Sequence, residues 1–252
     1  MRKLAAAVVI LTGGLLLYAA TDFPAWGDLE SPASDSEVSK HFIAETGVDT
    51  EVPNMVTAVL ADYRGFDTMF ETVVIFIAGI AILGILKLTG KDAIRPARKR
   101  KDEVADVPDL IVAHTVRLLV PVIQLFAFYV LAHGHVSPGG GFQGGVIMGA
   151  SFILVALAWD LPRAMDRLSV DRAILFAGVG ILIYAGIGLL SMLLGGEFLD
   201  YAELSAIFPV SREMARYYAM LGVEIGVAFT VTTVMFAIYA SLSSKGRLEG
   251  GL

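Results

Sequence analysis

The sequence predicts an all-α, polytopic membrane protein of about six transmembrane helices, with its N and C termini in the cytoplasm. Three observations lead to this fold class: few residues are charged, the apolar residues form long blocks, and the basic residues gather between alternate blocks. Of the 252 residues 56% are hydrophobic and 17% are charged, whereas soluble domains carry roughly a quarter charged residues. With a mean hydropathy of +0.71, the chain has too little polar surface to cover a soluble globule.

Six apolar stretches reach or approach the ~20 residues with which a helix crosses a bilayer. Their Ala, Leu, Ile, Val and Gly content favours helices over the alternating strands of a barrel. The stretches are Leu4–Ala20, Thr68–Leu88, Leu110–Ala132, Gln143–Trp159, Ala173–Leu194 and Tyr217–Leu242. The first also fits a cleavable signal peptide, because Arg2 and Lys3 precede it and Tyr18-Ala19-Ala20 ends it. We expect it to be retained, and cleavage would leave the orientation of the later spans unchanged.

The basic residues predict the orientation of these spans. With the N terminus in the cytoplasm, 15 of the 19 lysines and arginines fall on the cytoplasmic side, as the positive-inside rule requires. The other four are Lys40, Arg64, Arg212 and Arg216. The densest basic run, Arg95–Lys101, lies directly between two spans, so we interpret it as a topology anchor at the anionic leaflet. An isoelectric point near 5.2 agrees with the expectation that nucleic acid is not a partner.

The chain divides into two predicted pieces. Residues 1–101 hold two spans and an acidic external segment over 21–66, and residues 102–252 hold four spans in two hairpins. The charged, proline-interrupted stretch Thr89–Pro108 is typical of a linker.

Two short helices are also predicted outside the spans. One covers Val52–Leu60 and is capped near Asn54. The other, Glu197–Phe208, is amphipathic and is expected to lie at the outer interface.

A glycine-rich turn covers His133–Gly145 and reads HGHVSPGGGFQGG. Three of its glycines, Gly139, Gly141 and Gly144, formally fit the GxGxxG pattern of dinucleotide-binding proteins. That pattern needs a preceding strand and a βαβ unit, and here a membrane helix precedes it. We therefore reject a nucleotide site, and a P-loop is excluded because no Gly-Lys-Ser/Thr follows.

Small residues recur on predicted helix faces. Gly141, Gly145 and Gly149 share one face of the fourth span, and Gly222 and Gly226 form a similar pair in the last span. Glycine stripes of this kind allow close packing of membrane helices. The neighbouring helix belongs either to this chain or to a partner, and the sequence leaves both interpretations open.

Ionisable residues within or beside the spans are candidates for an ion path, since charge in a bilayer is costly. The candidates are Glu224, Asp67, Glu71, Asp62, Arg64, His133 and His135. Glu224 lies about a third of the way into the last span, where a proton or cation role and a buried structural hydrogen bond remain equally open. Asp67 and Glu71 lie one helical turn apart, near enough for Asp62 and Arg64 to pair with them. For Asp62 and Asp67, a solvated boundary or a capping role is the alternative.

The remaining composition argues against catalysis. The chain has no cysteine, which excludes disulfides, a thiolate nucleophile and the usual iron–sulfur ligands. Its four histidines show no spacing that is typical of a metal site. We therefore expect no metal, no cofactor and no enzymatic activity.

The segment Leu118–Leu157 resembles the B-subunit domain of the multisubunit Na⁺/H⁺ antiporters of the Mrp (Mnh) type. The resemblance is carried by His133-Gly134-His135, then Ser137, Pro138, Gly139, Gly140, Gly141 and Phe142, and then Gln143, Gly144 and Gly145. The segment Asn54–Thr68 is similar to the C-terminal region of the large A subunit of the same complexes, through the string DYRGFDT at 62–68. Related membrane-bound hydrogenases carry that piece as a small separate subunit, so the first two spans resemble a fusion.

The resemblance implies a complex of several different membrane subunits in a bacterial or archaeal cytoplasmic membrane, exchanging Na⁺ for H⁺. We expect an accessory subunit that supports assembly and lines part of the ion path, with other antiporter subunits and the lipid bilayer as partners. The alternative is a subunit of the ion-pumping module of a membrane-bound hydrogenase or a related complex I-like oxidoreductase. A self-sufficient channel or transporter is a third, weaker hypothesis, because no inverted repeat is visible in the sequence.

Overall fold

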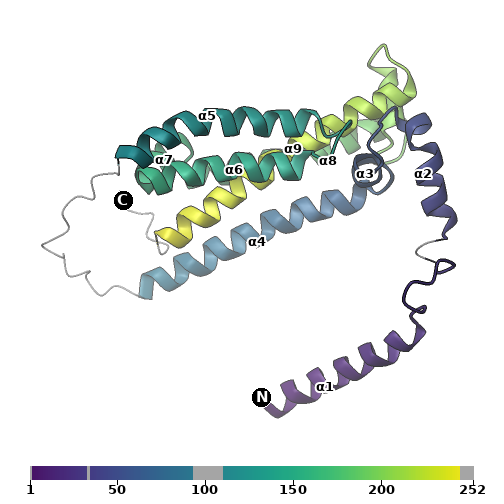
Figure 1. The fold of residues 1–252 in the computed structure, drawn as a ribbon, viewed down its shortest axis with the longest axis horizontal. Helices are drawn as coiled ribbons and strands as arrows, with labels where there is room; N and C mark the ends of the chain where they lie inside the picture. Colours follow the sequence, from purple (N-terminus) through teal and green to yellow (C-terminus); the bar gives the residue numbers. More distant parts are fainter. Residues whose placement is uncertain (1, 33–34, 93–109, 245–252) are drawn as a thin grey trace, which may run out of the picture. The chain divides into compact units, whose positions relative to one another are not determined.

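The computed structural model describes residues 2–32, 35–92 and 110–244, and the described part contains helices and connecting turns but no strand. Its α-helices are α1 (Arg2–Ala19), α2 (Glu37–Thr50), α3 (Met55–Ala58), α4 (Gly65–Asp92), α5 (Leu110–Ala132), α6 (Gly141–Ala158), α7 (Leu161–Arg167), α8 (Val170–Leu193) and α9 (Arg212–Ser243) (Figure 1). Three short helical turns accompany them: η1 (Ala20–Asp22), η2 (Val59–Tyr63) and η3 (Tyr201–Ala206).

Six of the described helices are long and apolar enough to cross a membrane, which confirms the predicted fold class. They are Arg2–Asp22, Gly65–Leu86, Leu110–Ala132, Gly141–Ala158, Val170–Leu193 and Arg212–Ser243. The last begins five residues before the predicted start at Tyr217, because Ser211 caps it by accepting the N–H of Met214. The orientation of the two termini stays a prediction.

The chain forms two compact units, Met1–Glu45 and Thr46–Leu252. In the first unit α1 buries none of its residues, and Lys40 pairs with Asp35 at 2.5 Å. The second unit contains α3 to α9 and all of the features described below.

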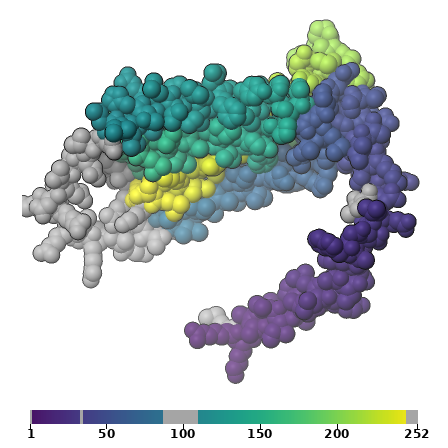
Figure 2. Space-filling view, in the orientation of Figure 1, coloured from purple at the N-terminus to yellow at the C-terminus, as the bar shows by residue number. Residues whose placement is uncertain are grey.

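Helix α9 is the centre of the second unit. It packs against α8, α6 and α4, and 67% of its most apolar window is buried, compared with 11% for α4. In the space-filling view, α5 and α6 cover much of α9, and α4 lies along its other visible side (Figure 2). Residues on α9 are therefore placed to meet side chains from most of the other helices of this unit.

Two apolar clusters hold the helices together at opposite ends of α9. One contains Tyr184, Tyr201 and Met220, all at most 1% exposed. The other contains Val155 and Phe236, together with the buried residues where α7 meets α8. Burial of this apolar surface fixes how α8 and α6 pack on α9 within the unit.

Two predicted connecting segments differ from the structure. The interfacial helix expected over Glu197–Phe208 is the 3₁₀ turn η3, and it packs on α8 and α9 through buried Tyr201 and Leu204. The linker expected from Thr89 begins later, because α4 continues through Asp92 before the first helix-breaking proline, Pro96. The remainder of that linker, with the basic run at 95–101, lies outside the described residues.

The short helix predicted near Asn54 is confirmed as α3. The Asn54 side chain accepts the N–H of Val56 at 3.1 Å and so caps the helix. One turn of π-helix, η2, follows directly and leads into α4 at Gly65. This irregular segment brings residues 54–64 of the N-terminal piece against the glycine-rich turn and α9.

Candidate functional site

Glu224 is the ionisable side chain that lies deepest in a described span, about three turns after the start of α9. It is 8% exposed, and its Oε2 atom is buried with no hydrogen-bond partner among the described residues. A buried carboxylate oxygen without a partner is costly and rare. Such an atom marks a place where a proton, a cation or water has a reason to bind.

The glycine-rich turn folds directly over this carboxylate. Gly140 adopts a φ of 115°, which L side chains rarely adopt, and a Cβ atom there would lie 2.6 Å from Glu224 Oε1. A Cβ atom on Gly134 would lie 2.8 Å from the Gly140 backbone and 3.3 Å from Glu224 Oε2. The glycines of the motif are therefore needed for the close approach of backbone to carboxylate.

His135 is the second buried polar group of the site. It is 1% exposed, its Nε2 atom lies 3.9 Å from Glu224 Oε2, and its ring meets Tyr217 edge-on at 4.3 Å between centroids. Neither of its ring nitrogens has a hydrogen-bond partner in the described part of the chain. Burial lowers the pKa of His135 to about 4, so the imidazole is neutral at neutral pH. A neutral imidazole near a carboxylate can either donate or accept a proton.

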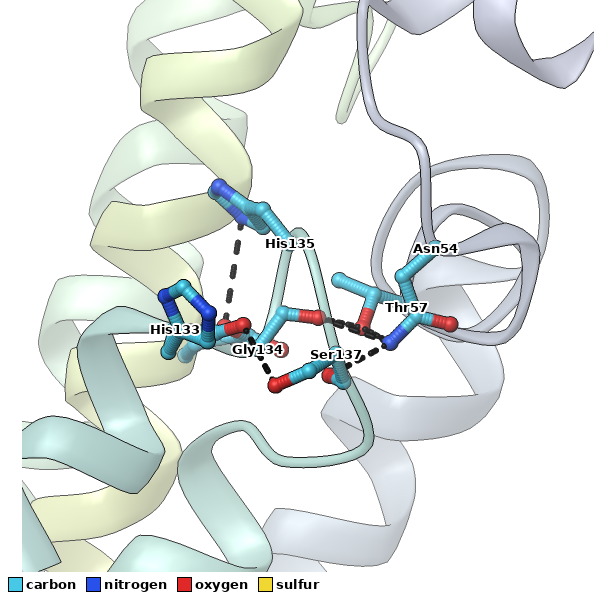
Figure 3. A network of polar contacts seen from close by, with 7 residues as sticks. Asn54, Thr57, His133, Gly134, His135 and Ser137 are labelled. Carbon is cyan, nitrogen blue, oxygen red and sulfur yellow. Dashed lines mark hydrogen bonds and ion pairs between the residues drawn. The ribbon is translucent and has the colours of Figure 1, made fainter.

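The N-terminal piece holds the turn in place. The Asn54 side-chain amide donates to the carbonyls of Gly134, at 2.7 Å, and Ser137, at 3.0 Å. The Thr57 hydroxyl donates to the same Gly134 carbonyl at 2.7 Å, and the Asn54 N–H donates to the His135 carbonyl at 2.9 Å. Figure 3 shows these groups converging on the turn from the opposite side to α9. The turn is thus clamped between α3 and Glu224.

A cavity of about 180 Å³ adjoins the carboxylate. Its polar lining comes from Glu224, Asn54, Thr57, Thr68 and Gln143. The volume is sufficient for several water molecules, and these groups offer the hydrogen bonds that buried water needs. The site can therefore hydrate a proton or a small cation beside a single carboxylate. In the described part of the chain no group of three His, Asp or Glu side chains could hold a metal ion.

The other acidic candidates lie elsewhere in the unit. Arg64 pairs with Asp67, as the spacing suggested. Glu71 is exposed and has no ion-pair partner among the described residues. Asp62 pairs instead with Arg216 of α9 through two hydrogen bonds of 2.8 Å, a partner that sequence reasoning placed only in an outer loop.

The Asp62–Arg216 pair is part of a small, partly buried network. The Tyr63 ring lies 5.6 Å from the Arg216 guanidinium carbon, and its hydroxyl donates to Asp49 at 2.6 Å. Burial and the neighbouring Asp49 raise the pKa of Tyr63 to about 12, so this hydroxyl keeps its proton. A bidentate Arg–carboxylate pair of this kind fixes geometry, and here it ties η2 to α9.

His133 is placed differently from His135 although both belong to the turn. Its ring is partly exposed and stacks on Tyr129 at 4.9 Å between centroids. The Ser137 N–H donates to its carbonyl at 3.0 Å. Of the two histidines, only His135 lies within 4 Å of the Glu224 carboxylate in the described part of the chain.

The glycine stripes pack within the chain. Added Cβ atoms on Gly145 and Gly149 would meet backbone atoms of α9 at 3.1 Å, and one on Gly141 would meet the Glu224 carbonyl itself. Gly226 faces the Gly180 carbonyl of α8 and Gly222 faces Ile187. The first stripe therefore brings α6 against α9, and the second brings α8 against the opposite side.

Comparison with family models matches both pieces of the chain. Residues 111–237 match the model described as "Domain related to MnhB subunit of Na+/H+ antiporter", and residues 1–102 match the model of the E subunit of MBH, named MbhE. A protein named "Putative antiporter subunit mnhB2" from Staphylococcus aureus strain Newman is 33% identical over 135 residues, which are 54% of this chain and 94% of the relative. The protein of the same name from strain JH1 gives the same values.

Two solved complexes contain chains of similar structure. One is the archaeal membrane-bound sulfane sulfur reductase, a respiratory membrane complex, with a TM-score of 0.62, 25% identity, and coverage of 96% of this chain and 97% of that chain. The other is the Mrp complex from Dietzia sp. DQ12-45-1b, with a TM-score of 0.67 and 26% identity. In the second case 99% of this chain matches only 26% of a longer chain. In both complexes, single chains hold counterparts of both pieces.

Proposed function

Because the chain belongs to the family of domains related to the MnhB subunit of Na⁺/H⁺ antiporters, we propose that it is one membrane subunit of a multisubunit monovalent cation/proton antiporter. Its six apolar helices and its likeness to chains of membrane complexes support a multi-pass subunit with other antiporter subunits as partners. The proposed location is the cytoplasmic membrane of a bacterium or archaeon, and the proposed transported ions are Na⁺ and H⁺.

Within such a complex the proposed role is accessory: the chain supports assembly and lines part of the ion path at Glu224. The observation that carries this role is the buried, unpartnered Glu224 oxygen beside a polar cavity and a neutral His135. No other ionisable side chain lies as deep in a described span, so this subunit alone lacks the row of charges that a complete path needs. We also propose that it is not itself an enzyme, because the sequence shows no nucleophile–base pair and no spacing that is typical of a metal site.

The test replaces Glu224 and measures Na⁺/H⁺ antiport in inverted membrane vesicles over a range of pH. Glu224→Gln keeps size and hydrogen bonding but removes titration, so antiport should fall substantially or its pH dependence should move, with subunit stoichiometry unchanged. Glu224→Asp keeps the titrating group and should retain more activity. The matched control is Glu213→Gln, a partly exposed glutamate in the first turn of the same helix, which should behave as wild type.

The opposite ordering would assign Glu224 a structural role. In that case Gln is tolerated at every pH, and Asp disturbs assembly because its shorter side chain no longer reaches the turn. Wild-type transport by the Gln variant across the range would remove Glu224 from the ion path.

A second candidate function is a subunit of the ion-pumping module of a redox complex. It is favoured by the match of residues 1–102 to the MbhE model and by the full-length likeness to a chain of the sulfane sulfur reductase complex. The two candidates separate when the tagged complex is purified under mild conditions and its chains are identified. Antiporter subunits alone support the first candidate, and co-purifying iron–sulfur or nickel–iron proteins support the second.

A further inference from the structure

Three arginines gather at the end of the bundle where α5 begins and α6 ends. Arg117, Arg163 and Arg167 line one hollow of about 490 Å³, together with Gln124 and Trp159. No aspartate or glutamate lines it. In the described part of the chain, none of these arginines has an ion-pair partner. We refer to this feature as the arginine hollow.

The position and the charge of the arginine hollow point to an anionic ligand. Arg117 lies about two turns inside α5, a helix long enough to span the membrane. All three arginines are exposed, and three cations around one hollow repel one another. A phosphate group offsets this repulsion, because the guanidinium fork matches its oxygens in pairs.

Trp159 marks the depth of the hollow. It ends α6, and the Arg163 guanidinium carbon lies 5.9 Å from the centre of its ring. Tryptophan is enriched at the level of lipid headgroups, where its ring meets both apolar and polar surroundings. We therefore expect the arginine hollow at the depth at which lipid phosphates occur.

An apolar groove of about 480 Å³ shares Arg167 with the arginine hollow. Its walls include Phe128 of α5, Phe152 of α6 and Phe176 of α8, and its floor is α9 over residues 225–233. That floor is about 12 Å long, close to the ~15 Å that one leaflet contributes to a ~30 Å hydrocarbon core. The groove runs along the helices, as acyl chains do in a bilayer.

We propose that the arginine hollow and the apolar groove together bind one phospholipid with an anionic headgroup. The phosphate lies among Arg117, Arg163 and Arg167, and one acyl chain lies in the groove beneath Arg167. A phospholipid joins an anionic headgroup to a long apolar chain. The arginine hollow and the apolar groove, which share Arg167, can accommodate these two parts. The bilayer supplies such lipids directly at the site, and basic pockets between membrane helices are a recurrent way of holding them.

The test uses the intact complex, stripped of loosely bound lipid and titrated with phosphatidylglycerol or phosphatidylcholine while native mass spectrometry counts bound lipids. The wild-type complex should prefer phosphatidylglycerol. Each arginine near an anionic headgroup changes binding about fivefold, so Arg163→Gln/Arg167→Gln should weaken the retained phosphatidylglycerol by roughly 25-fold. Met148→Trp, which fills the apolar groove, should weaken retention of both lipids.

The matched control is Arg172→Gln, at the start of α8 and outside the lining of both hollows. It should leave lipid binding unchanged. Equal binding of the two lipids by wild type, or unchanged phosphatidylglycerol binding by the double variant, would overturn the proposal. Because the chain has no cysteine, Arg163→Cys gives this subunit a single attachment point. An efficient cross-link from it to another subunit's acidic residue would also overturn the proposal, by showing that a protein fills the hollow.

Discussion

At the scale of single residues, the surroundings of Glu224 depend on two glycines of the turn, which have no Cβ atom to keep the backbone away from the carboxylate. Gly134 and Gly140 let main-chain atoms approach the carboxylate to distances that a Cβ atom would forbid. Asn54 and Thr57 hold the turn in this position from its other side, by donating hydrogen bonds to the Gly134 carbonyl. Glu224 therefore faces a rigid turn, and its environment depends on contacts made by α3.

We predict that Asn54→Asp destabilises the subunit by about 1–3 kcal/mol. Aspartate still caps α3, but it cannot donate to the carbonyls of Gly134 and Ser137 and it repels them. Thr57→Val should cost less, about 0.5–1.5 kcal/mol, because Asn54 still serves the shared carbonyl. The measurement is thermal unfolding of the purified complex. The control is Thr115→Val, at an exposed position on α5, and equal effects at 54 and 115 would contradict the clamp.

His135 leads to a prediction about pH. Its pKa is about 4 in the folded protein and about 6.5 when unfolded, so the unfolded state binds more protons between these values. Stability from neutral His135 is then present above about pH 6.5 and is lost as pH falls toward 4. The groups facing the ring from α9 are Glu224 and Tyr217.

Wild type should therefore lose up to about 2 kcal/mol more than His135→Gln between neutral pH and about pH 5. Melting temperatures of both complexes at several pH values check this difference. His133→Gln, at a partly buried side chain of the same turn, is the control. Parallel loss in wild type and His135→Gln would show that His135 does not titrate in this way.

The sequence alone placed Glu224 and His135 among seven ion-path candidates, because an ionisable residue in a span and an unusual motif are both visible in the sequence. It did not separate His135 from His133. It did not reveal Asn54, Thr57 or Arg216. Asn54 and Thr57 act on a turn about 80 residues away, and Asp62 meets Arg216 across 154 residues. An asparagine before a short helix predicts a cap, and only the fold shows that its amide also reaches a distant turn.

At the scale of helices, α9 is held between two glycine-lined faces. The α6 face meets it through Gly141, Gly145 and Gly149, and α8 meets it through Gly180 opposite Gly226. The sequence predicted the six spans from their length and composition. It could not predict whether the glycine stripe of α6 packs against a helix of this chain or against a partner. Both neighbours would present an equally apolar surface, and only the fold identifies α9 as the neighbour.

We predict that Gly145→Ala destabilises the subunit by about 1–3 kcal/mol. The added Cβ would lie 2.9 Å from Val231 Cβ and 3.1 Å from the Ala228 carbonyl oxygen, so α6 and α9 must separate. Gly145→Leu should go further and abolish the assembled complex on a native gel. Gly178→Ala and Gly186→Ala are matched controls on α8, since nothing lies within 4 Å of a Cβ at either position. They should be neutral or stabilise by about 0.5–1 kcal/mol.

At the scale of the whole molecule, the distribution of charge predicts how the chain crosses the membrane. A reporter fused after Arg100 or after Lys245 should be cytoplasmic, and one near Ser36 or Gly139 should be external, because 15 of the 19 basic residues lie on the predicted inner side. Accessibility to a membrane-impermeant label checks each position. Finding Ser36 and Arg100 on the same side would contradict the six-span arrangement.

The hydrogen bonds from Asn54 and Thr57 to the turn join two pieces that match separate family models. Where such pieces belong to different chains, the closing of the turn depends on how often the two chains meet. Within one chain the encounter is intramolecular, at an effective concentration that is independent of expression level. Each copy of the subunit then contains both the turn and the residues Asn54 and Thr57 that anchor it. The turn over Glu224 is therefore anchored in every copy, whatever the amounts of the other subunits.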